Sequence, residues 1–210
     1  MRIAPPTYVN TKARRPLHNT ELMLRYGAAY GCMLVALAAA QLVSDNAFIL
    51  VLVGVTLVGL PLSLTLRRLM IADTPWRNYR FVINSCVVLG SIACSFLYLI
   101  FTHPELLSVR FMHVLMVEYG VADSIKVLME LFLIFSAFRA VAIVNDKDAV
   151  LSAVPSFSAL LLLMVIHRGP QVVVYFALWT VMAAILFALD HRAESANNVH
   201  GRIFAVKVGQ

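Results

Sequence analysis

The residues of this sequence best suited to chemistry in an apolar setting are Asp123, Lys126 and Glu130. Spacings of three, four and seven residues place them on one face of a helix. Ionisable side chains at membrane depth are costly and often mark an ion or proton path. An ion pair between Lys126 and Glu130 explains the same residues without transport, because buried charges pair readily. We favour the ion pair and keep a small proton-coupled transporter that uses Glu130 as an alternative.

Histidine would supply a second kind of chemistry, the ligation of a metal ion or a pigment. The sequence has six histidines, and no two of them are spaced four residues apart on an apolar stretch. A metal site built within one helix is therefore not predicted. His113 alone falls in a semi-apolar helical pattern, and we retain it as a candidate contact for a pigment or a partner subunit. Bound lipid is otherwise the only ligand that we expect.

Nucleophilic catalysis is not predicted from these residues. Cys32, Cys86 and Cys94 all fall inside apolar stretches and form no CxxC pair, so they are expected to pack as small apolar side chains. The sequence contains neither a GxSxG elbow nor a glycine-rich phosphate loop. We identify no catalytic residue and do not expect the chain to be an enzyme.

The elements that must position these residues are apolar helices. The chain is 61% hydrophobic and only 13% charged, with a mean hydropathy of +0.84. A membrane core about 30 Å thick needs about 20 residues of helix per crossing. Apolar stretches of about that length occur at 22–43, 47–66, 81–101, 123–144, 149–166 and 171–189. We predict an all-α, polytopic integral membrane bundle of six transmembrane helices over residues 22–190, with tails at 1–21 and 191–210.

The distribution of positive charge predicts the orientation of this bundle. Most of the 17 Lys and Arg residues precede the first stretch, follow the last, or fall in the second and fourth connections. The opposite side has only Arg110 and Arg168. Positive charges in short loops stay on the cytoplasmic side, so both termini are predicted to be cytoplasmic. The chain has a net charge of +6, and most of its basic residues would then lie against anionic lipid headgroups rather than nucleic acid.

Two further segments have a predicted role in packing. The segment after Pro104 has a periodic apolar pattern broken by charge, which predicts an interfacial helix near 105–120 on the non-cytoplasmic surface. Gly27 and Gly31 form a GxxxG motif in the first apolar stretch. Small residues four apart allow a neighbouring helix to approach closely, and we expect these two to pack inside the chain's own bundle.

The second half of the chain resembles a known family. Arg139 closes one apolar stretch, Lys147-Asp148-Ala149 opens the next, and a very short turn leads to the last. Residues of about 126–190 thereby resemble the N-terminal membrane region of bacterial TgpA-type transglutaminase-like membrane proteins. The sequence departs from that pattern at Ala142, where the family has Glu, and at Asp146, where it has a basic residue. The resemblance implies an anchor in the bacterial cytoplasmic membrane whose catalytic domain would lie beyond this sequence.

The sequence thus leaves three functional hypotheses. We favour a non-enzymatic membrane scaffold or accessory subunit that packs against other integral subunits of a larger complex, of photosynthetic or respiratory type. Short loops, the GxxxG motif and the missing catalytic set support this hypothesis. The alternatives are the membrane anchor of a transglutaminase-like enzyme and the proton-coupled transporter.

Overall fold

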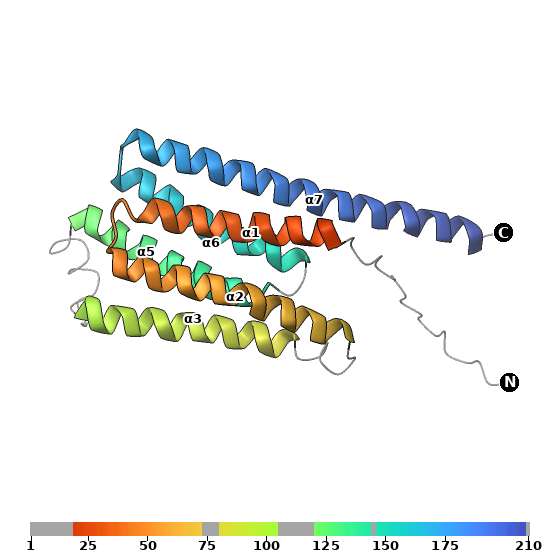
Figure 1. Cartoon of the computed structure of the whole chain (residues 1–210), viewed down its shortest axis with the longest axis horizontal. Helices are drawn as coiled ribbons and strands as arrows, with labels where there is room; N and C mark the ends of the chain where they lie inside the picture. Colours follow the sequence, from red (N-terminus) through yellow and green to blue (C-terminus); the bar gives the residue numbers. More distant parts are fainter. Residues whose placement is uncertain (1–18, 73–79, 105–119, 144–145, 209–210) are drawn as a thin grey trace.

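A computed structural model describes residues 19–72, 80–104, 120–143 and 146–208 of the chain. Over these residues the chain forms six α-helices and no strand, which confirms the all-α prediction (Figure 1). The helices are α1 (Asn19–Ala40), α2 (Asn46–Ala72), α3 (Arg80–Thr102), α5 (Gly120–Val141), α6 (Asp146–Ile166) and α7 (Pro170–Val208). The predicted interfacial helix near 105–120 and its His113 lie outside the described residues, apart from Gly120.

The helices begin and end at residues with special backbone properties. The turn between α1 and α2 is closed by hydrogen bonds from the Val43 and Ser44 amides to the Ala40 carbonyl, at 3.0 and 2.9 Å. Gly120 opens α5 with a φ of +74°, a conformation that favours glycine. Pro170 opens α7 at the first helical position, where its missing N–H costs nothing.

The helices lie side by side in an up-and-down arrangement. Helices α1, α3 and α6 run in one direction, and α2, α5 and α7 run in the other (Figure 1). The start of α1 and the end of α7 therefore lie at the same end of the bundle. We call this end the α1-start end, and we call the other, which carries the α1–α2 turn, the α1–α2 turn end.

Five of the six helices are long and apolar enough to cross a membrane, as expected for a membrane protein. These are α1, α2, α3, α6 and α7, whose most apolar stretches have mean hydropathies between 1.5 and 2.5. Helix α5 forms close to the predicted place but does not meet this measure. Its charged residues Asp123, Lys126, Glu130 and Arg139 are spread along its length.

Helix α5 nevertheless occupies the middle of the bundle, packed against α1, α2, α3 and α6. One tight contact of α5 is with α2. A Cβ added at Gly59 of α2 would lie 3.1 Å from the Ala140 Cβ and 3.2 Å from the Val141 amide nitrogen. A side chain at this position would therefore require the α5 backbone to shift by a few tenths of an ångström.

The predicted GxxxG motif contributes through one of its two glycines. A Cβ added at Gly31 would lie 3.1 Å from Sδ of Met182, so this position is at the contact between α1 and α7. Gly27 is exposed, and a Cβ there would meet nothing within 4 Å. Close packing inside the bundle thus involves Gly31 and, unforeseen from the sequence, Gly59.

Two helices depart from a uniform bundle. Helix α3 is peripheral, because α5 is its principal neighbour and only 6% of its most apolar stretch is buried, against 56% for α1. Helix α7 continues without a break past Arg192, where its apolar stretch ends, to Val208 (Figure 1). The predicted boundary between membrane domain and tail at residue 190 thus lies within a single helix. With 39 residues, α7 is about 58 Å long at 1.5 Å per residue.

Candidate functional site

The first candidate site centres on Glu130 of α5, whose side chain is only 3% exposed. Its two carboxylate oxygens accept hydrogen bonds from two other parts of the chain. Ser44 Oγ, in the α1–α2 turn, donates to Oε1 at 2.9 Å. The Tyr98 hydroxyl, on α3, donates to Oε2 at 2.5 Å. A single carboxylate therefore ties α5 both to the α1–α2 turn and to α3.

The positions of Ser44 and Tyr98 show at which level of the bundle Glu130 lies. Ser44 lies in the turn between two helices, and Tyr98 lies one turn before α3 ends at Thr102. Glu130 is consequently at the level of the α1–α2 turn end rather than halfway along the bundle. The preceding residues of α5 continue outward from this level.

The three predicted ionisable residues all lie on α5 but differ in burial. Asp123 is exposed and Lys126 is half-buried, whereas Glu130 is buried. Among the described residues, no ion pair joins Lys126 to Glu130. The carboxylate is instead satisfied by hydroxyl groups that the sequence reasoning did not connect to it. In the sequence, only their positions near the ends of apolar stretches could have pointed to Ser44 and Tyr98 as partners of Glu130.

The Tyr98 donor lies among other rings. The Tyr98 ring lies 4.9 Å from the Phe48 ring and 6.0 Å from the His103 ring, measured between centroids. Hydrogen bonds to a carboxylate in such low-dielectric surroundings are strong. Within the described ranges, no three His, Cys, Asp or Glu side chains are grouped closely enough to hold a metal ion. The hydrogen bonds that the cluster does make hold α5 to the α1–α2 turn and to α3.

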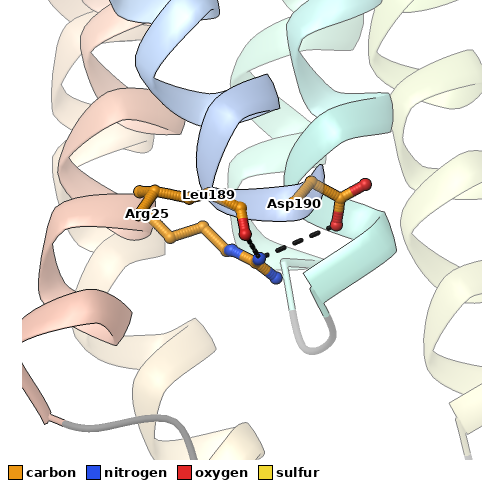
Figure 2. A network of polar contacts seen from close by, with 3 residues as sticks. All are labelled: Arg25, Leu189 and Asp190. Carbon is orange, nitrogen blue, oxygen red and sulfur yellow. Dashed lines mark hydrogen bonds and ion pairs between the residues drawn. The ribbon is translucent and has the colours of Figure 1, made fainter. Parts of the chain in front are cut away.

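A second polar cluster lies at the α1-start end and was missed by the sequence reasoning. The Arg25 side chain on α1 is fully buried and points toward α7 (Figure 2). Its Nη2 atom donates to the Leu189 carbonyl at 2.9 Å and lies 3.7 Å from the Asp190 carboxylate (Figure 2). A buried guanidinium needs such partners, because taking a charge out of water is expensive. Arg25 thereby ties the first helix to the last.

Two tyrosines of α1 extend this cluster to α5. The Tyr26 hydroxyl donates to the Ile143 carbonyl at 2.6 Å, and the Tyr30 hydroxyl donates to the Ala140 carbonyl at 2.7 Å. Tyr30 also lies 3.0 Å from Ser63 Oγ on α2. The last carbonyls of a helix have no partner within it. The tyrosines therefore supply donors at the α5 terminus, inside an apolar bundle.

The structure also places the three cysteines, Arg139 and Asp148. Cys32 is buried, Cys94 half-buried and Cys86 exposed, and all three are free thiols. Arg139 lies in the last turn of α5, and Asp148 is buried in the first turn of α6, where a helix favours negative charge.

No protein-family model, curated protein or solved structure matches this chain. The resemblance of residues 126–190 to the TgpA-type membrane region therefore stays a prediction. The described fold and its two polar clusters define a helical membrane protein whose buried Glu130, Arg25, Tyr26 and Tyr30 connect helices to one another.

Proposed function

We propose that this chain is a non-enzymatic integral membrane scaffold or accessory subunit, and that α3 packs against a transmembrane helix of another subunit. The observation that carries the proposal is the isolation of α3, with only 6% of its most apolar stretch buried. Large apolar side chains cover its outer surface, including Leu89, Phe96 and Phe101. Helices of membrane bundles gain stability by packing against other helices. Among the described residues, α3 gains little of this stabilisation from neighbouring helices.

The role of the buried polar groups also supports a structural function. Transporters hold substrate and coupling ions near the middle of the membrane, often at broken helices. Glu130 lies instead at the level of a helix-joining turn, and each of its oxygens accepts a hydrogen bond from a hydroxyl. We therefore prefer the structural role for Glu130 over the proton-coupled transporter.

The proposal includes a topology of six membrane-spanning helices with both termini in the cytoplasm. The central position of α5 supports its membrane placement, because neighbouring helices pack against it and bury Glu130, its charged residue farthest from both ends. The basic residues Arg67, Arg68 and Arg192 at the α1-start end support the cytoplasmic assignment of that end. The resemblance to a bacterial family supports the bacterial cytoplasmic membrane as the location.

The native Cys86 allows a direct test, because its side chain is exposed on α3. A photoreactive maleimide would be attached to Cys86 in native membranes of a Cys94→Ser variant, with Cys32 protected by burial. We expect one membrane protein to be cross-linked in high yield and to co-purify with the unmodified chain at fixed stoichiometry.

The matched control carries Cys86→Ser and Leu57→Cys, which moves the probe to a 53% exposed position on α2. This control should give a much lower yield of the same adduct. If both positions form adducts only with lipid, and the native chain purifies as a free monomer, the proposal is refuted.

A further inference from the structure

Exposed and half-exposed arginines gather at the α1-start end of the bundle. Arg68 lies one residue before the end of the apolar part of α2, and Arg192 is the last residue of the apolar part of α7. Both side chains are exposed, whereas those of Arg67 and Arg139 are half-buried. Because α2, α5 and α7 run in the same direction, all four lie toward the same end (Figure 1). We call these four residues the arginine girdle.

The opposite end has a different balance of charge. Among the described residues there, the exposed charged side chains are Asp45, Asp123 and Arg168, and Lys126 is half-buried. Acidic and basic groups balance at this end, whereas at the α1-start end the four girdle arginines outnumber the exposed Glu21 and the 35% exposed Asp190. The two ends of the bundle would therefore meet a charged membrane surface differently.

Local contacts fix part of the girdle in place. The Arg67 guanidinium lies over the Tyr26 ring, with Cζ 5.8 Å from the ring centroid, a cation–π geometry. The Tyr26 ring is itself held by its hydrogen bond to the Ile143 carbonyl. Arg25, by contrast, is fully buried against Leu189 and Asp190 and is not part of the girdle.

We propose that the arginine girdle binds the phosphate groups of anionic phospholipids in the membrane leaflet at the α1-start end. Arginines at the ends of membrane helices lay their stems along apolar surface and direct the guanidinium to the headgroup level. There the planar guanidinium matches phosphate oxygens with paired hydrogen bonds. The inference rests on the membrane placement of the bundle and is independent of the accessory role.

The test uses the full chain reconstituted in nanodiscs and released for native mass spectrometry. Phosphatidylglycerol and phosphatidylcholine with identical acyl chains would compete for retained lipid positions. The wild-type chain should retain phosphatidylglycerol preferentially, and the preference should fall as salt rises from 0.05 to about 0.5 M, since surface charge is screened. The double variant Arg68→Gln/Arg192→Gln should lose about 25-fold in preference, at about fivefold for each arginine near the surface.

The control variant Arg168→Gln removes an exposed arginine from the opposite end, where exposed Asp45 and Asp123 offset its charge, and should reduce the preference far less than the double variant does. Equal retention of both lipids by the wild-type chain would overturn the proposal, whether or not the double variant folds. An equal loss in the Arg168→Gln variant would overturn it too. Displacement of the lipid by millimolar inorganic phosphate would identify a site for free phosphate and would refute the assignment to lipid.

Discussion

Removal of the Tyr98 hydroxyl tests whether Glu130 fastens α3 to the bundle. The Tyr98→Phe variant keeps the ring that packs on Phe48 and deletes only the donor to Glu130 Oε2. A hydrogen bond to a charged group contributes about 1.5–3 kcal/mol in soluble proteins, whereas polar contacts in membrane bundles average about 0.6 kcal/mol. The carboxylate would keep only its bond from Ser44. We expect the free energy of unfolding to fall by about 1–2 kcal/mol, between these limits.

The assay is reversible unfolding in mixed micelles, followed by circular dichroism as the fraction of denaturing detergent rises. Tyr175 on α7 offers a matched control, because it is half-buried and its hydroxyl forms no hydrogen bond within the described residues. Tyr175→Phe should change the free energy of unfolding by less than about 0.5 kcal/mol. Cys94, half-buried on α3, should also react faster with a membrane-permeant maleimide in the Tyr98→Phe variant.

A double-mutant cycle assigns the effect to the carboxylate itself. In a Glu130→Ala background the Tyr98 hydroxyl has lost its acceptor, so Tyr98→Phe should cost almost nothing further. Directly contacting residues show coupling energies of about 0.5–3 kcal/mol. A Tyr98→Phe variant as stable as the wild type, or an equal loss in both backgrounds, would refute the fastening role of Glu130.

Two further predictions concern packing and the second polar cluster. Gly59→Ala should lower the free energy of unfolding by about 1–3 kcal/mol, because the new methyl group overpacks against the α5 backbone. Its control is Gly54→Ala, where a Cβ meets nothing within 4 Å. This control should be neutral or slightly stabilising in the same titration. Asp190→Ala should cost about 1–3 kcal/mol, below the range for fully buried pairs because Asp190 is 35% exposed. Asp123→Ala, an exposed acid at the other end, should leave stability unchanged, and a loss equal to that of Asp190→Ala would contradict the role assigned to Arg25.

The bounds of the helices could largely be predicted from hydropathy. The third apolar stretch was predicted at 81–101 and forms α3 at Arg80–Thr102, and the fifth was predicted at 149–166 and forms α6 at Asp146–Ile166. A chain that crosses lipid must satisfy its backbone within each segment, so a long apolar stretch leaves helix as its only option. The continuation of α7 to Val208 escaped this reasoning, because a helix does not have to end where its apolar residues end.

The partners of the buried polar groups could not be predicted from the sequence. Ser44 is 86 residues from Glu130, and Tyr98 is 32 residues from it. Arg25 and Leu189 are separated by 164 residues. Helical periodicity places a residue on one face of its own helix, but it does not say which other helix that face meets. The predicted pairing of Lys126 with Glu130 considered only neighbours along one helix, and the structure satisfies Glu130 from elsewhere.

The sequence by itself determined that this chain folds as apolar helices, because length, hydropathy and backbone hydrogen bonding are local properties. Only the tertiary structure decided that α5, the helix with the most scattered charge, lies in the middle and that α3 lies at the edge. It also decided that Gly59 rather than Gly27 permits close packing. These outcomes depend on the rotation and depth of each helix against its neighbours, and many contacts distant in sequence set them together.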